Sequence, residues 1–263
     1  MEDSHPFPMN RRRFFQSSAV FMSGLAAACG DGPTQPRHPA RLTTRPRNPT
    51  DTVSIGRSDI GLRDPFTGRD GFLYVPPGYA PATPTPLLVL LHGGSSAANS
   101  WWSQEFRDLV DPLGMVVLAP DSRAFLSWDV PGSGELQDDV AFLDDALRVV
   151  FDKVRVAPDR IGIGGFSDGA TEALAIGRAN GDLFSSIVAL SPGLLHHSVR
   201  FGTPEVFLAH GTDDQVFPVE GTRDVMRPAL EAEGLDVTWV EFDGGHAIST
   251  ELGEQAFTWF ING

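Results

Sequence analysis

The chain has 263 residues, and 20 Lys and Arg stand against 34 Asp and Glu, which gives a formal net charge of −14. This acidic balance argues against nucleic acids and anionic lipid surfaces as partners, because both carry negative charge themselves. Cys29 is the only cysteine, so the residues after it can form no internal disulfide, thiolate metal site or cysteine nucleophile.

The N-terminal residues have the pattern of an export signal. Arg11 to Arg13 and two phenylalanines precede an apolar stretch over residues 19–28 that is too short to span a bilayer. This arrangement resembles a twin-arginine signal and predicts export to the periplasm, the cell envelope or the medium. Cys29 follows three alanines, where a lipoprotein signal places its acylated cysteine, although cleavage after Ala28 by an ordinary signal peptidase also fits.

We expect three regions along the chain: a signal peptide over residues 1–28, a linker over 29–50 and one folded domain over 51–263. The linker is rich in Pro, Thr and Arg and shows no apolar periodicity, which is typical of a flexible tether. The remaining length suits a single domain with a large core. Contact with a membrane is expected only through a lipid anchor on Cys29.

Apolar runs alternate with amphipathic segments from residue 71 onward. Strands are expected over residues 71–75, 87–91, 115–119, 160–164, 184–190, 205–209 and 237–242, and helices over 100–113, 136–151, 170–176, 219–233 and 252–261. Continuous apolar strands are typical of a parallel sheet that is covered on both faces. The alternation therefore predicts an α/β fold with a mainly parallel sheet, and its short connections leave no room for a large lid domain.

Residues 165–169 read Gly-Phe-Ser-Asp-Gly, which matches the Gly-x-Ser-x-Gly pattern of a nucleophile elbow. An expected strand precedes the motif and an expected helix follows it, so a tight turn would expose the hydroxyl of Ser167 at the tip of the sheet. Any larger residue in place of the two glycines would collide with the neighbouring strand and helix. A serine hydroxyl is a weak nucleophile unless a base and an oxyanion site converge on it.

Further motifs follow in a meaningful order: Leu91-His92-Gly93-Gly94, then residues 210–218 (His-Gly-Thr-Asp-Asp-Gln-Val-Phe-Pro), then Gly244-Gly245-His246. With the elbow they make residues 70–263 similar to the α/β-hydrolase superfamily, especially to phospholipase/carboxylesterase, polyhydroxybutyrate-depolymerase and feruloyl-esterase-like enzymes. The resemblance implies an α/β-hydrolase fold and hydrolysis of a small-molecule or polymer-linked carboxylic ester, with no cofactor and no metal.

The resemblance also implies a role for each motif. Ser167 would be the nucleophile and His246 the general base, which later protonates the leaving alkoxide. The register His-Gly-x-x-Asp-x-Val-x-Pro selects Asp214 as the orienting acid, and Asp213 is the alternative that could instead brace the loop. The backbone N–H groups of Asp168 and Gly94 would form the oxyanion hole.

Other polar and aromatic residues allow two interpretations. Trp128 and Trp102 follow expected strand ends and could wall a substrate pocket, or they could simply pack in the core. We expect His92 and His210 to bond loop backbone. The pair at 196–197 is expected to face solvent, because adjacent histidines without a spaced carboxylate make a poor metal site.

Two other functions compete with an ester hydrolase. A serine peptidase of the same fold usually carries an additional propeller or cap domain, and no segment of this sequence fits one. A non-catalytic binding protein on a hydrolase fold is disfavoured because all three positions of the triad are filled.

Overall fold

The computed structural model describes residues 40–125, 127–129, 138–196 and 199–263. The signal peptide expected over residues 1–28 and the cysteine at position 29 lie outside these residues.

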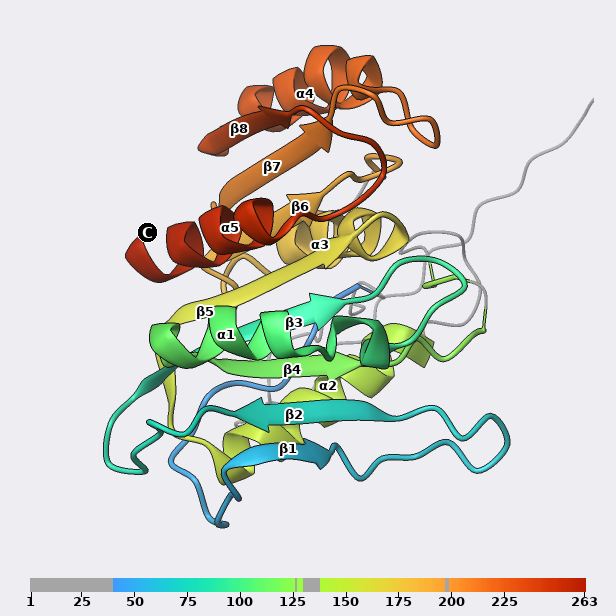
Figure 1. Cartoon of the computed structure of the whole chain (residues 1–263). Helices are drawn as coiled ribbons and strands as arrows, with labels where there is room; N and C mark the ends of the chain where they lie inside the picture. Colours follow the sequence, from blue (N-terminus) through green and yellow to red (C-terminus); the bar gives the residue numbers. More distant parts are fainter. Residues whose placement is uncertain (1–39, 126, 130–137, 197–198) are drawn as a thin grey trace, which may run out of the picture. The chain divides into compact units, whose positions relative to one another are not determined.

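Three consecutive strands open the described part of the chain, and from β3 onward strands and helices alternate except between β6 and β7 (Figure 1). The strands are β1 (Gly56–Asp59), β2 (Gly71–Val75), β3 (Thr85–Leu91), β4 (Val116–Pro120), β5 (Val156–Phe166), β6 (Ser186–Leu190), β7 (Glu205–Gly211) and β8 (Val237–Phe242). The helices are α1 (Gln104–Leu113), α2 (Asp138–Lys153), α3 (Asp168–Ala179), α4 (Arg227–Ala232) and α5 (Thr250–Asn262), with short turns η1 (Ala98–Trp101) and η2 (Gly221–Met226).

The eight strands form one sheet in the order β1-β2-β4-β3-β5-β6-β7-β8. The pairs β1–β2 and β2–β4 are antiparallel, and all the others are parallel. The chain runs from β3 to β4 on one side and then returns past β3 to β5, so the strand order reverses at β3. Ligands of such sheets bind beyond the carboxyl ends of the strands at this reversal. The loops after β3 and β5 are therefore where a site is expected.

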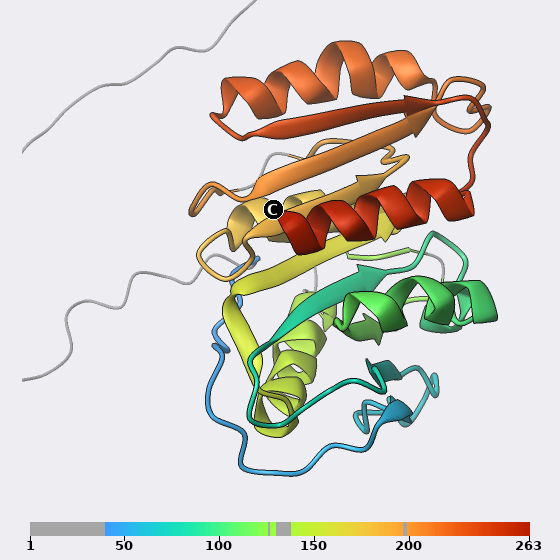
Figure 2. The ribbon, with the colours of Figure 1, turned by 60° about the vertical axis from the view of Figure 1, so that its left-hand side comes forward.

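Side chains of each central strand alternate between two apolar cores, one on each face of the sheet. In β3, Leu87, Val89 and Leu91 join the core that includes α2, α3 and α4, whereas Leu88 and Leu90 join the core that includes α1 and α5. Figure 2 shows α1 and α5 on the same face of the sheet. The predicted α/β architecture, a mainly parallel sheet between two layers of helices, is confirmed.

Several boundaries differ from the expected ones for local reasons. The helix expected over 100–113 is split, because the hydroxyl of Ser103 accepts the N–H of Phe106 and caps a new helix start. The helix expected over 219–233 is split as well, since Pro228 at the start of α4 has no N–H to bond the preceding turn. Within the described residues, no helix is long and apolar enough to cross a membrane.

Residues 40–47 form a strap that is packed on the domain. Ala40 and Leu42 are buried in the core on the α3 side, with exposed fractions of 0% and 2%. The side chain of Asn180, directly after α3, accepts the N–H of Leu42 at 2.8 Å and donates to the carbonyl of Ala40 at 2.7 Å. Arg41 and Arg45 both pair with the carboxylate of Asp182.

The strap is fastened to a second helix too. The N–H groups of Thr43 and Thr44 both donate to the carboxylate of Asp144 in α2 at 2.8 Å. The linker expected over 29–50 is therefore wrong at its C-terminal end: residues 40–47 belong to the folded domain. The packing of residues 40–47 could not be predicted from apolar periodicity, because hydrogen bonds between side chains and backbone hold the strap and it has no amphipathic pattern.

We predict that Asp182→Asn loosens the strap. The hydrogen bonds from Arg41, and after them those from Arg45, hold the pKa of Asp182 below its ordinary value. Burial acts in the opposite direction but is outweighed. Such a carboxylate stabilises the fold above its unfolded-state pKa, and this contribution is lost as the pH falls through the folded-state pKa. Because the pair is partly exposed, the loss at pH 7 should be about 1 kcal/mol. Urea unfolding measures it, and the gap to the wild type should narrow in acid.

Asp159→Asn, at an exposed position of β5, is the matched control and should leave the stability nearly unchanged. Equal stabilities of the Asp182→Asn variant and the wild type at pH 7 would contradict the role of the ion pairs.

Glu172 is a buried carboxyl group in α3, with an exposed fraction of 1%. Its Oε1 atom has no hydrogen-bond partner among the residues that the structure describes. Burial raises the pKa of Glu172 well above its usual range, and the negative charges of Asp139, Asp168 and Asp129 add to the shift. The folded state therefore keeps this proton at pH values where the unfolded chain releases it.

We predict that Glu172→Gln flattens the dependence of stability on pH. A raised folded-state pKa makes the wild type lose stability as the pH rises above the unfolded value, by up to about 1.4 kcal/mol per pH unit. The amide does not ionise, so the variant should gain on the wild type steadily between pH 5 and pH 8. Denaturant unfolding at several pH values measures the difference, and parallel curves would count against a buried neutral Glu172.

Candidate active site

Ser167 lies in the sharp turn between β5 and α3, in a strained backbone conformation. Its φ is 58° and its ψ is −119°, a region that residues with side chains rarely adopt. Its N–H donates to the carbonyl of Leu190 in β6, and its own carbonyl accepts the N–H groups of Ala170 and Thr171 at 3.1 Å. Strain of this kind costs about 1–3 kcal/mol and persists only where the surroundings enforce it.

The two glycines of the motif allow this turn to approach β3. A methyl group on Gly169 would lie 2.3 Å from the carbonyl oxygen of Leu91, and one on Gly165 would lie 2.5 Å from the backbone of Gly169. Neither position can hold a side chain, because the obstructing atoms are backbone. The collision expected from the sequence is thus present, and it brings the start of α3 against the end of β3.

The side chain of His246 reaches Ser167 from the loop after β8. Its Nε2 atom lies 2.8 Å from the hydroxyl oxygen of Ser167, and its Nδ1 atom lies 2.6 Å from Oδ2 of Asp214. The rings of Phe166 and Phe217 flank the imidazole, with centroids 4.7 Å and 5.5 Å away. These contacts hold the ring in the plane that joins the hydroxyl to the carboxylate.

Asp214 is buried in the turn after β7 and is held by backbone. Its Oδ1 atom accepts the N–H groups of Val216 at 2.8 Å and Phe217 at 2.9 Å. Burial alone would raise the pKa of Asp214, but the hydrogen bonds from Phe217, His246 and Val216 outweigh it and leave the pKa below its ordinary value. The alternative acid, Asp213, is exposed, and the carboxylate that hydrogen-bonds His246 is that of Asp214.

A polar network fixes the loop that follows β3. The Nδ1 atom of His92 lies 2.8 Å from the carbonyl oxygen of Gly93, and its Nε2 atom lies 3.1 Å both from the backbone nitrogen of Ser122 and from Nη2 of Arg69. Both groups at Nε2 are donors, so Nε2 accepts and Nδ1 carries the proton that bonds Gly93. Burial lowers the pKa of His92, and the positive charge of Arg69 adds to this shift. The hydrogen bond to Gly93 acts in the opposite direction but does not cancel it.

This network orients one peptide unit beside the serine. A methyl group on Gly93 would lie 3.6 Å from Cβ of Ser167, so the loop passes directly next to the elbow. The carbonyl of Gly93 faces the ring of His92, and in a trans peptide the N–H of the next residue points the opposite way. The N–H of Gly94 is therefore directed away from His92. Gly94 itself is exposed.

The carboxylate of Asp168 faces away from this turn and fastens another loop. It accepts the N–H of Trp128 at 3.0 Å and the hydroxyl of Ser127 at 2.9 Å. The indole N–H of Trp128 donates to the carbonyl of His92 at 2.7 Å, and the two rings are in contact with centroids 4.7 Å apart. Trp128 is 5% exposed, so it braces the loop after β3 and has little surface left for a substrate.

Trp102 packs in an aromatic cluster with Phe72, Tyr74 and Phe106, at centroid distances from 5.3 to 6.3 Å. The guanidinium of Arg107 lies 4.9 Å from its ring. These contacts fit the core-packing interpretation of Trp102, which was one of the two alternatives for this residue.

Strain is concentrated at the carboxyl edge of the sheet. The residues other than glycine with positive φ, within the described ranges, are Ser95, Ser167 and Ser191, which follow β3, β5 and β6. Ser191 is fully buried, and within the described part of the chain its hydroxyl has no hydrogen-bond partner. Residues in such conformations cluster at functional sites. The site is thus marked by the backbone as well as by its side chains.

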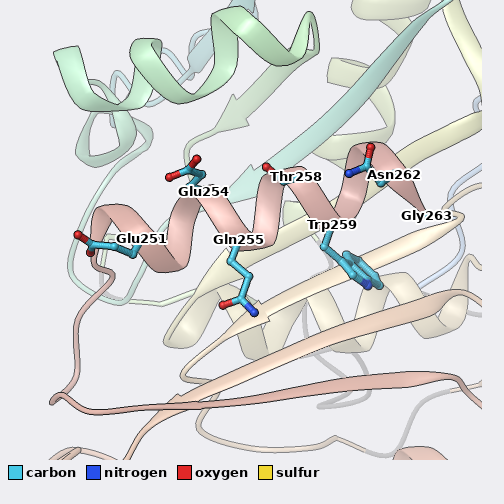
Figure 3. Close-up of a pocket in the computed structure, with 7 residues that line it drawn as sticks. All are labelled: Glu251, Glu254, Gln255, Thr258, Trp259, Asn262 and Gly263. Atoms are coloured by element: carbon cyan, nitrogen blue, oxygen red, sulfur yellow. The ribbon is translucent and has the colours of Figure 1, made fainter.

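Other hollows and clusters do not compete with this site. The hollow along α5, of about 620 Å³, is lined by polar residues such as Glu251 and Glu254 and by Trp259, and neither Ser167 nor His246 borders it (Figure 3). Among the residues that the structure describes, no group of three or more His, Cys, Asp or Glu is arranged to hold a metal ion.

Some contributors were missed from the sequence. Arg69 is 6% exposed and donates to the carbonyl and the hydroxyl of Ser122. It belongs to no recognised motif, so the sequence pattern does not distinguish it. The aromatic flanks of His246 were missed as well. Phe166 and Phe217 occupy the x positions of the recognised motifs, where any residue is allowed. The motifs therefore carry no signal for the contact of these rings with His246.

Solved structures resemble this fold over most of its length. The crystal structure of esterase PE8 matches with a TM-score of 0.58 and 24% identity, covering 74% of this chain and 98% of that one. A CE1 ferulic acid esterase from Anaeromyces mucronatus, solved with ferulic acid, matches with a TM-score of 0.59 and 18% identity, covering 79% and 89%. These likenesses show the α/β-hydrolase fold that the sequence resemblance implied.

Sequence comparisons agree with the structural ones. Feruloyl esterase C from Emericella nidulans is 26% identical over 211 residues, which cover 69% of this chain and 77% of that protein. The model of the Esterase family, described as "Putative esterase", matches residues 67–249, which is more than half of the chain. The protein therefore belongs to this esterase family and is a carboxylic ester hydrolase.

Proposed function

We propose that the protein hydrolyses carboxylic esters through an acyl-enzyme on Ser167, with His246 as the general base and Asp214 as its orienting acid. The observation that carries the proposal is the unbroken chain of contacts from the Ser167 hydroxyl to His246, at 2.8 Å, and on to Asp214, at 2.6 Å. Both lengths suit proton transfer along hydrogen bonds.

In the first half of the reaction, Oγ of Ser167 attacks the ester carbonyl carbon while its proton passes to Nε2 of His246. The tetrahedral intermediate then collapses, the bond to the alkoxide breaks, and the imidazolium returns the proton to the leaving oxygen. Asp214 remains ionised and balances the positive charge on His246. In the second half, the same nitrogen takes a proton from a water molecule, whose oxygen attacks the acyl carbon. The bond from the acyl carbon to Oγ of Ser167 then breaks, His246 returns the proton to Oγ, and the acid is released.

The backbone N–H groups of Asp168 and Gly94 would stabilise the oxyanion. Asp168 begins α3, where the first N–H groups have no partner within the helix and the helix dipole favours negative charge. The peptide that carries the N–H of Gly94 is oriented by His92 and runs beside Ser167. Such preorganised donors act on charge that develops only in the transition state.

The substrate class follows from the relatives and from the loops around the serine. A relative is named feruloyl esterase C, and we infer that this protein takes esters of aromatic or other apolar acids, either free or linked to a polymer. Phe125, Leu194 and Val216 are each more than half exposed on the loops that follow β4, β6 and β7. They offer apolar surface at the edge of the sheet that carries Ser167.

We further propose that the protein is exported, because Arg11 to Arg13 precede an apolar stretch over residues 19–28. Cys29 is then the candidate for a lipid anchor. Metabolic labelling with a fatty acid, compared between the wild type and a Cys29→Ala variant, tests it: a label that persists in the variant would exclude this anchor.

We predict that Ser167→Ala and Asp214→Asn lower kcat/KM for p-nitrophenyl esters, the first by about four orders of magnitude or more, because the nucleophile is absent. The wild type should react with a fluorophosphonate probe and Ser167→Ala should not. Ser185→Ala, at the opposite edge of the sheet, is the control and should be labelled like the wild type.

A folded wild type that resists the probe and hydrolyses no ester would support a binding protein. Cleavage of amides in preference to matched esters would support the peptidase alternative. Either result would overturn the proposed reaction.

We predict that His92→Leu lowers kcat by about 100-fold with little change in KM, because the peptide that presents Gly94 loses its hold. His92→Asn keeps a donor near the position of Nδ1 and should retain more activity. Steady-state kinetics on one activated ester measure both variants. A rise in KM with unchanged kcat would mean that His92 shapes substrate binding and not the oxyanion site.

A further inference from the structure

His210 is a fully buried histidine directly behind the acid of the triad. It lies at the end of β7, one residue before Gly211, and its side chain is 0% exposed. Its Nε2 atom lies 2.8 Å from the carbonyl oxygen of Phe217 and 3.1 Å from Oδ2 of Asp214. Its Nδ1 atom lies 2.9 Å from the hydroxyl of Thr222, which is 2% exposed.

These partners determine where the proton of His210 sits. The carbonyl of Phe217 and the carboxylate of Asp214 can only accept hydrogen bonds, so Nε2 carries a hydrogen. This hydrogen bonds the carbonyl of Phe217, and Oδ2 of Asp214 lies 3.1 Å from the same nitrogen. In the neutral ring Nδ1 is then an acceptor, and the hydroxyl of Thr222 can donate to it. The ring is thus held in one tautomer by three neighbours.

Asp214 accepts three hydrogen bonds from described residues, and a fourth nitrogen, Nε2 of His210, lies close to it. Its Oδ1 atom accepts two backbone N–H groups, while Oδ2 faces two imidazoles, His246 at 2.6 Å and His210 at 3.1 Å. A carboxylate that shares its charge among more donors is a weaker acceptor for each of them. A second imidazole N–H beside Oδ2 would therefore weaken the hydrogen bond that Oδ2 accepts from His246.

We propose that His210 is a positioning residue that both anchors Asp214 and limits how strongly Asp214 stabilises the protonated form of His246. The inference rests on the proposed roles of Ser167, His246 and Asp214. His210 holds the turn through Phe217 and tunes the carboxylate through Oδ2. The bond to loop backbone expected for His210 is present, and the contact with Asp214 adds a part in the reaction.

The surroundings contain few other groups that could produce the same effect. Thr222 of η2 faces Nδ1, the main chain of Phe217 faces Nε2, and His246 approaches from the loop after β8. The nearby carboxylates in sequence, Asp213 and Asp243, are both exposed. Their influence on the pH profile should be screened by salt, whereas that of a buried contact should not.

The test compares pH profiles of kcat/KM for His210→Leu, His210→Gln and the wild type on an activated ester. Without the donor, Asp214 binds the proton on His246 more firmly, so His210→Leu should move the acid limb up by about 0.5 to 1 pH unit, at high and low salt alike. The amide nitrogen of His210→Gln can stand near the place of Nε2 and should bring the limb back toward the wild type.

Two further variants separate tuning from simple damage. Leu230→Ala opens a buried site in α4 and lowers stability without touching Asp214, so it should leave the acid limb in place. Thr222→Val keeps the shape of its side chain and removes the hydroxyl that orients His210. It should move the limb in the same direction by a smaller amount, and it decides the question if the His210 variants do not fold.

An acid limb that stays fixed in His210→Leu, or in Thr222→Val if that variant alone folds, would overturn the inference and leave His210 a purely structural residue. The proposed function is judged separately. If Ser167→Ala and Asp214→Asn retain full activity, the triad itself is wrong, whatever the profiles of the His210 variants show.

Discussion

The close contact between the start of α3 and the end of β3 is the constraint on which the rest of the site depends. Gly169 lies so near the carbonyl of Leu91 that no side chain fits between them. This contact forces Ser167 into its strained conformation and brings the nucleophile beside the loop from Gly93. Backbone packing therefore places the proposed nucleophile, Ser167, beside the loop that carries Gly94 before any substrate binds.

Buried polar residues behind the reactive groups hold the loops in place. On one side, Arg69 and Ser122 fix the tautomer of His92, which orients the peptide before Gly94. On the other side, His210 stands behind Asp214. Each of these histidines precedes a glycine at the end of a parallel strand. The sheet thus fixes both histidines, and each imidazole holds the loop that follows its strand: His92 through Gly93 and His210 through Phe217.

The central part of the fold could be predicted from the sequence because its signals are local. Continuous apolar runs such as 87–91 mark strands buried on both faces, and the glycines of the elbow have a steric meaning that needs no tertiary information. The register that residues 210–218 share with similar esterases also favoured Asp214 over Asp213. These features depend on one strand or one turn at a time.

What could not be predicted depends on partners far apart in the chain. Arg69 meets His92 across the sheet, and nothing near it in sequence identifies the contact. Trp128 was a candidate wall for the substrate, yet its indole and backbone are used by His92 and Asp168. Residues 40–47 lack any periodicity, because their hold on the domain comes from Asn180, Asp182 and Asp144. Such pairings are decided only when the strands assemble.

The strap also has a mechanical consequence. It grips the C-terminal end of α3, and the nucleophile stands at the other end of that same helix, which spans 12 residues and hence about 18 Å. If the chain is exported and anchored as proposed, tension on its N-terminal part would reach the domain at Asn180 and Asp182. The nucleophile elbow lies at the other end of α3, away from the point where the tension is applied. Anchoring would therefore leave the geometry around Ser167 unchanged and accessible to the substrate.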